Sequence, residues 1–174
     1  MPWLILGLCR AQSPTQPDPP AAAFGTTVVR PSGLRGEVYL ISEHATQLPR
    51  FDKLKSCGSI YIDSLNSPAR DFTEGFPGVT KRTEWFAIDY TGRFWIEKPG
   101  PYGFSLTSDD GSKLYIDGRV VIDNDGIHPP TEKTETVTLK GGIHLIRVSY
   151  FQGPRYNIAL VLRVAGAGRG VADL

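Results

Sequence analysis

Two adjacent aspartates, Asp109 and Asp110, lie between two runs of alternating apolar and polar residues and directly precede Gly111. Asp-Gly is favoured turn chemistry, so the pair can be the solvated tip of a β-hairpin. The alternative is a calcium site, because a hard divalent cation relieves the repulsion between two converging carboxylates. Neighbouring side chains on a strand point to opposite faces, so a shared ion requires a turn or a cis peptide bond between the two residues.

The second Asp-Gly pair, Asp117-Gly118, has a simpler interpretation. It separates two short alternating runs, and this arrangement predicts a type I′ hairpin turn without a ligand. A catalytic pair is not expected at Asp109 and Asp110 either. Glycosidase carboxylates flank their substrate about 5–9 Å apart and usually come from different strands. No Ser–His–Asp or Cys–His arrangement stands out, and the chain is therefore predicted not to be an enzyme.

The segment 123–126 (Asp-Asn-Asp-Gly) partly matches an EF-hand loop, with Glu132 at the right interval. Val121 occupies the position of the first ligand, and Pro129-Pro130 interrupt the loop, so this interpretation fails. We expect an ordinary loop whose tip, from Asn124 to His128, borders a ligand site. The three histidines are too widely spaced to suggest a metal centre.

Composition excludes two classes of partner. The 174 residues carry a formal charge of +1, which provides no electrostatic footprint for nucleic acid or for an anionic membrane. The 19 glycines, 14 prolines and many aromatic residues instead favour a turn-rich, all-β domain.

The first eleven residues resemble the end of a signal peptide. The apolar run Trp3–Leu8 is too short to span a membrane, and small residues at Cys9 and Ala11 suit a signal peptidase. A lipoprotein acylated at Cys9 and an unstructured apolar tail are the alternatives. Export predicts a secreted, periplasmic or cell-surface protein, and cleavage would leave Cys57 as a single thiol, expected to be buried or half-buried.

The remaining chain divides into three parts. Residues 12–30 form a Pro-rich linker, residues 31–165 a folded domain, and residues 166–174 a small, polar tail that should fray. Within the domain, residues 64–83 are predicted to be a long surface loop, and Trp85 and Trp95 are predicted to pack in the core. Alternating runs that amount to about nine strands favour an antiparallel β-sandwich. The strand signals lie within residues 36–41, 59–63, 84–90, 93–96, 102–107, 114–116, 120–122, 134–139, 143–151 and 156–164.

An ordered series of motifs resembles the PA-fourteen (PA14) domain family, a jelly-roll-like β-sandwich found in flocculin-type adhesins, glycosidases and bacterial surface proteins. The most specific block runs from Ser108 to Gly118 (SDDGSKLYIDG), and flanking matches cover residues 33–39, 94–96, 99–104, 141–148 and 150–151. The resemblance extends over roughly residues 33 to 164.

The resemblance also implies a ligand set. In the adhesin branch two successive aspartates joined by a cis peptide hold a calcium ion that contacts sugar hydroxyls, and these positions correspond to Asp109 and Asp110. An Asn side chain and two backbone carbonyls complete the set; here Gln152 replaces the Asn, and Pro154 and Tyr156 are the candidate carbonyls. Further carbohydrate contacts are expected from Asn124, His128, Arg155 and Tyr156.

These observations predict a non-catalytic, extracellular carbohydrate-binding module with Ca²⁺ as its cofactor. Its partner would be an extracellular glycan or a cell-wall polysaccharide. The alternative is a structural or assembly module of the cell envelope that binds no small ligand. Neither interpretation requires a membrane span, and the sequence does not determine the oligomeric state.

Overall fold

The computed structural model describes residues 33–79, 82–166 and 172–173. The predicted leader and the predicted linker therefore lie outside the described residues. Two short 3₁₀ helices, η1 (Phe51–Lys53) and η2 (Phe72–Glu74), interrupt a chain that otherwise forms strands. The strands of the described part are β1 (Leu34–Leu40), β2 (Gly58–Ile62), β3 (Asn66–Asp71), β4 (Phe86–Ile96), β5 (Gly100–Asp109), β6 (Ser112–Ile116), β7 (Arg119–Asn124), β8 (Thr131–Leu139), β9 (Gly142–Gln152), β10 (Asn157–Gly166) and β11 (Ala172–Asp173).

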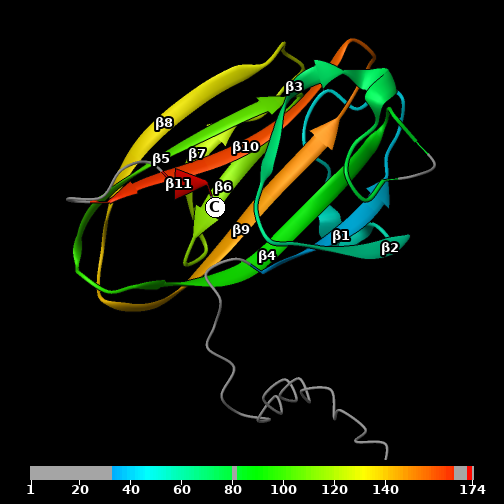
Figure 1. Ribbon diagram of the computed structural model, residues 1–174. Coiled ribbons are helices and arrows are strands. Elements are labelled where there is room, and N and C mark those ends of the chain that lie inside the picture. The colour runs from blue at the N-terminus through cyan, green and yellow to red at the C-terminus, as the bar shows by residue number, and fades with distance from the viewer. Residues whose placement is uncertain (1–32, 80–81, 167–171, 174) are drawn as a thin grey trace, which may run out of the picture.

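The described strands form two antiparallel sheets, which confirms the predicted all-β sandwich (Figure 1). One sheet has the order β2-β1-β4-β9-β6-β7, and the other has the order β11-β10-β5-β8 with β3 also paired to β10. In Figure 1 the arrowheads of β5 and β9 lie at the same end of the sandwich, where the loop between β9 and β10 also lies. The two segments expected to share a ligand therefore meet.

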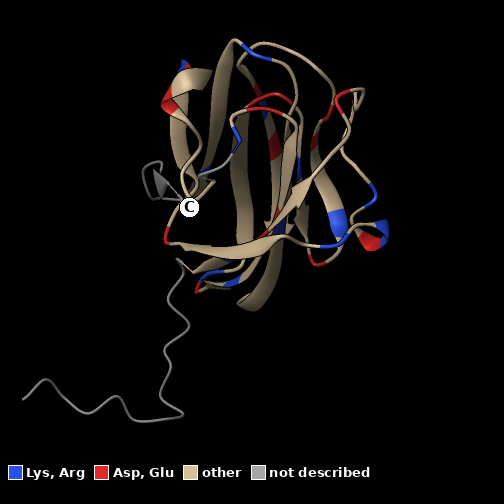
Figure 2. Cartoon of the chain, turned by 90° about the vertical axis from the view of Figure 1, so that its right-hand side faces the viewer, with Lys and Arg blue, Asp and Glu red and all other residues tan. Residues whose placement is uncertain are grey.

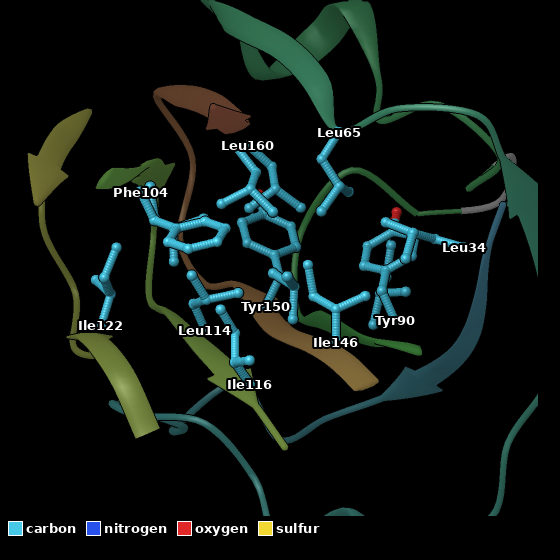
Figure 3. Packing of buried hydrophobic residues seen from close by; sticks show 14 of the residues in the cluster. Leu34, Leu65, Tyr90, Phe104, Leu114, Ile116, Ile122, Ile146, Tyr150 and Leu160 are labelled. Carbon is cyan, nitrogen blue, oxygen red and sulfur yellow. The ribbon is translucent and has the colours of Figure 1, made fainter. Parts of the chain in front are cut away.

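The core lies between the two sheets and is built from the apolar face of each alternating strand. Figure 3 shows Phe104 and Leu160 from one sheet packed against Leu114, Ile146 and Tyr150 from the other. Burying a side chain of this size contributes roughly 1.5–3 kcal/mol to the free energy of unfolding. Acidic and basic residues are interspersed around the outside, in keeping with the near-neutral charge (Figure 2).

The sequence separates the alternating runs 84–90 and 93–96 by a turn at Thr91-Gly92, and the prediction of this turn is wrong. β4 continues through it, and the pairing with β9 is unbroken from Phe86 opposite Gln152 to Ile96 opposite Gly142. Gly92 does not form a turn but allows Leu34 to pack closely against β4, because a Cβ on Gly92 would lie 2.6 Å from the Leu34 side chain. Glycine within a strand often marks such an approach of a neighbouring chain.

The prediction of a continuous surface loop over residues 64–83 is also wrong. β3 pairs with β10 in this segment, although Pro68 lies inside the strand and the register shifts between Ile158 and Leu160. Proline is tolerated in edge strands and at such irregularities, so a strand that contains proline is not recognised from the sequence pattern. Within the same segment Phe76 is buried in the core.

Three side chains lie in environments different from those predicted. Trp95 is 58% exposed, because Phe94 and Ile96 take the inward positions on β4. Trp85 is half-buried just before β4, and Cys57 is exposed with its thiol directed to the Val38 carbonyl. Their aromatic or apolar character suggested burial, but strand alternation and loop position place them at the surface.

The predicted type I′ turn at Asp117-Gly118 is confirmed, with φ angles of 50° and 78°. Asp117 also fastens the hairpin to β9, because its carboxylate accepts a hydrogen bond from the Leu145 amide and lies 2.6 Å from the His144 ring. The tail was expected to fray, but its described part, β11, pairs with β10. No helix among the described residues is long and apolar enough to cross a membrane.

Candidate functional site

Asp109 and Asp110 form the corner between β5 and β6. The peptide bond between them is cis. Asp109 is the last residue of β5 and pairs with Ala159 of β10. Both aspartates are buried, with exposures of 4% and 3%, so the corner is not a solvated hairpin tip.

The Asp110 carboxylate is held by two backbone amides from distant segments. Gly153 N donates to Oδ2 at 2.7 Å, and His128 N donates to Oδ1 at 3.2 Å. Burial raises the pKa of Asp110, while these two hydrogen bonds favour its ionised form and oppose that rise. The side chain is therefore fixed in position and keeps free lone pairs on both oxygens.

The Asp109 carboxylate has a different environment. It receives no hydrogen bond from any residue that the structure describes, although the Tyr150 hydroxyl approaches its backbone carbonyl at 2.7 Å. Burial and the negative charge of Asp110 raise the pKa of Asp109 to about 7, and the imidazole of His128 only partly offsets this rise. A buried carboxylate without a donor is unfavourable unless a cation or a proton is present.

Gln152, the predicted side-chain ligand, ends β9 and is fully buried. Its Oε1 lies 2.5 Å from the Tyr150 hydroxyl, and its Nε2 donates to the carbonyls of Asn157 at 3.0 Å and Pro154 at 3.4 Å. The Tyr150 hydroxyl has one hydrogen and two acceptors, Gln152 Oε1 and the Asp109 carbonyl. A reversed amide would remove this conflict, but it would place Gln152 Oε1 against two carbonyl oxygens, a contact that only a bound cation would relieve.

The loop between β9 and β10 carries the other predicted contacts. The Tyr156 carbonyl accepts a hydrogen bond from Phe72 N at 3.2 Å, and its ring is 79% exposed. Arg155 is also exposed, and its Nε lies 3.4 Å from Glu84 Oε1. Pro154 directs its carbonyl toward Gln152. The loop thus presents two large side chains to solvent, next to the Asp110 carboxylate.

The segment 124–128 closes the site on its other side. Asn124 is buried, and its Nδ2 donates to Ser108 Oγ and to the Thr131 carbonyl, whereas no described partner contacts its buried Oδ1. The His128 ring lies between the carbonyls of Asn124 and Pro129, at 2.9 Å from each. His128 reaches Asp110 through its backbone amide. The structure therefore brings both predicted residues to the site, with Asn124 beneath the surface.

Three further residues shape the site and were not identified from the sequence. Gly153 supplies the amide that holds Asp110, and Tyr150 supplies the hydroxyl next to Asp109. Gly111 permits the close packing of the corner, since a Cβ there would lie 2.4 Å from the Phe151 ring and 2.8 Å from Gly126 N. In the sequence, only the two glycines could have indicated close packing at the site. Tyr150 follows the alternating pattern of an ordinary core residue.

One structural observation makes the site compatible with calcium. The Asp109 carboxylate is buried and lacks a hydrogen-bond donor among the described residues. Within the same described part of the chain, no group of three or more His, Cys, Asp or Glu side chains forms a metal centre. The other predicted ligands, Gln152, Pro154 and Tyr156, would supply neutral oxygens. Ca²⁺ accepts such mixed sets of carboxylates, amide oxygens and backbone carbonyls.

Comparison with known proteins identifies a family and a relative that this chain matches. A family model described as the PA14 domain matches residues 51–169, more than half of the chain. The curated protein Anti-sigma-I factor RsgI3 from Acetivibrio thermocellus is 29% identical over 125 residues, which are 71% of this chain and 18% of that protein.

Two solved structures are similar in fold at low sequence identity. The PA14 sugar-binding domain from an RTX adhesin has a TM-score of 0.65 at 17% identity, and the match covers 82% of this chain and 94% of that one. The Epithelial Adhesin 9 A domain from Candida glabrata, solved in complex with Galβ1-3GlcNAc, has a TM-score of 0.54 at 13% identity, with 82% and 86% covered. On the extent of the family match, the chain belongs to the PA14 domain family.

Proposed function

We propose that this chain is a non-catalytic carbohydrate-binding module whose ligand site is built on Asp109 and Asp110, with calcium as its cofactor. The observation that carries the proposal is the Asp109 carboxylate, which is buried beside a second carboxylate and lacks a hydrogen-bond donor among the described residues. Two such groups repel each other when both are ionised, and a bound cation removes that repulsion.

Different residues of the chain would bind the ion and contact the sugar. Asp109 and Asp110 would hold the ion, with Gln152 contributing its amide oxygen if the amide is reversed and Pro154 and Tyr156 as carbonyl candidates. A bound calcium ion supplies positions at which sugar hydroxyls can coordinate. Arg155 and Tyr156 would provide planar donors and an apolar face at the rim.

Two structural neighbours support the proposed ligand class. One is a sugar-binding domain of an adhesin, and the other was solved with a disaccharide. By this analogy we infer an extracellular glycan or a cell-wall polysaccharide as the partner, and a secreted, periplasmic or cell-surface location. The choice of sugar depends on the loops around the site.

A glycan array probed with and without calcium tests the proposal. Binding by the wild-type chain in calcium should disappear in EDTA and in the Asp109→Asn variant. The exposed Asp52→Asn variant, which makes the same chemical change on η1, should bind like the wild type. Binding that survives both EDTA and Asp109→Asn would contradict the calcium-dependent site.

A structural or assembly module is the second candidate, and an exposed apolar patch favours it. Trp95 pairs with Ile143 across β4 and β9, and Leu145 lies on the same face two residues further along. All three side chains are more than half exposed. Exposed apolar groups gathered on one face are typical of contact surfaces for other proteins. An array without any binding in calcium would favour this candidate.

A further inference from the structure

A second region suited to a sugar ring lies beside the Asp109–Asp110 site, on the other side of Gly153. The Gly153 amide donates to Asp110, and its carbonyl accepts a hydrogen bond from Trp85 N at 3.4 Å. A single residue therefore separates the Asp110 carboxylate from the backbone of Trp85. A ligand that extends beyond the acidic pair across Gly153 would reach the Trp85 side.

The backbone of Trp85 is held in a rare conformation. Its φ angle is 56°, which is unusual for a bulky residue, and its carbonyl accepts hydrogen bonds from Ile41 N at 3.1 Å and Arg82 Nη1 at 3.3 Å. The next residue, Phe86, is fully buried in the core. Uncommon backbone geometry that is fixed by its surroundings occurs preferentially at functional sites.

Trp85 lines a surface hollow of about 670 Å³. The lining residues include, besides Trp85, three acidic residues, two threonines and one arginine: Glu43, Glu74, Glu84, Thr73, Thr83 and Arg82. Its volume is within the range of pockets that take small ligands. Aromatic rings offer a flat apolar face, and carboxylates accept hydrogen bonds from hydroxyl groups, so one aromatic among acceptors suits a sugar ring.

The loop between β9 and β10 connects this hollow to the acidic pair. Arg155, which projects from that loop, lies 3.4 Å from Glu84 Oε1 in the lining. The Tyr156 carbonyl accepts a hydrogen bond from Phe72 N, next to Thr73 on η2. The same short loop therefore borders both regions.

We propose that Trp85 forms a second sugar subsite and that the ligand is an oligosaccharide spanning from the Asp109–Asp110 pair to this hollow. The inference rests on the proposed function, because it extends the same glycan site. It assigns Trp85 a role in specificity, namely a preference for longer glycans over a single sugar.

The test measures the affinity of neutral mono-, di- and trisaccharides that an array identifies, in calcium, by titration calorimetry. Trp85→Ala should weaken oligosaccharide binding about three- to tenfold, the range expected for loss of one aromatic contact, and should leave monosaccharide binding unchanged. Trp85→Phe should retain most of the affinity. Trp95→Ala is the matched control, because it removes an exposed tryptophan near the opposite end of β4.

The outcomes separate the two proposals. If the wild-type chain binds oligosaccharides and Asp109→Asn abolishes this, but folded Trp85→Ala binds as well as wild type, the subsite is refuted and the proposed function stands. Equal losses with Trp85→Ala and Trp95→Ala would also refute the subsite. If the wild-type chain binds no sugar in calcium, the proposed function fails and the subsite fails with it. Thermal melting of each variant establishes that it is folded.

Discussion

The amide nitrogen of Gly153 donates to Asp110 Oδ2 across 2.7 Å, and so joins two loops that are 43 residues apart in the chain. The other oxygen of the same carboxylate accepts a hydrogen bond from His128 N. One side chain thus connects the β5–β6 corner, the β7–β8 loop and the β9–β10 loop. The site depends on the assembled sandwich, since no single segment contains these three contacts.

Tyr150→Phe should destabilise the site without creating a large cavity. The substitution removes the hydroxyl that lies between the Asp109 carbonyl and the Gln152 side chain, and it leaves these buried groups short of a partner. We expect a loss of about 1–3 kcal/mol in the free energy of unfolding, measured by urea denaturation.

Tyr90→Phe is the control for that change. Tyr90 is also buried, but the structure gives its hydroxyl no hydrogen bond within the described residues. Its loss should cost less than about 0.5 kcal/mol, because it removes no hydrogen bond to a described residue. Similar costs for the two variants would show that the Tyr150 hydroxyl does not organise the site.

Gly111→Ala should disturb the corner directly. The added Cβ would meet the Phe151 ring at 2.4 Å and Gly126 N at 2.8 Å, and the backbone nitrogen cannot move aside without shifting its loop. Overpacking of this kind typically costs about 1–3 kcal/mol. Gly58→Ala should be tolerated, because a Cβ at that position would have no described atom within 4 Å. Equal melting temperatures for both variants would contradict the close packing at Gly111.

The pH dependence of stability should report the buried state of Asp109. Its folded-state pKa of about 7 lies above the reference value of 3.8, so the native chain binds the proton more tightly than the unfolded chain. In EDTA the free energy of unfolding should therefore fall as pH rises from about 4 to about 7.

Asp109→Asn isolates this contribution, because it removes the titrating group at the same position. Urea midpoints of the wild-type and variant chains, compared at pH values below about 4 and above about 7, should differ mainly in slope with pH. Parallel pH profiles would mean that the Asp109 carboxylate titrates normally in the folded chain.

Alternation along the chain predicted the sandwich because most strands bury one face, as Phe86, Ile88 and Tyr90 do on β4. The wrong predictions have physical causes. Gly92 suggests a turn in the sequence, whereas in the structure it allows close packing against Leu34, and Pro68 concealed β3. A glycine or proline has the same appearance in a sequence whether it bends the chain or accommodates a neighbour.

The acidic pair could be predicted from the sequence, but the backbone hydrogen bonds that hold it could not. Asp109 and Asp110 stand out because they are adjacent and charged. Gly153 and His128 hold Asp110 through backbone amides, which every residue type except proline carries, so no pattern of side chains predicts these two hydrogen bonds, although His128 itself was expected at the site. Their role follows only from the meeting of loops at one end of the sandwich.

The most direct test of the calcium site is thermal melting of the wild-type chain with calcium and with EDTA at a pH of about 8, where Asp109 is ionised. Calcium at roughly a hundredfold excess over its dissociation constant should raise the melting temperature by roughly 5–10 °C. Asp109→Asn should abolish the rise, and Asp52→Asn should retain it. A wild-type melting curve that is the same in calcium and in EDTA would contradict the calcium site.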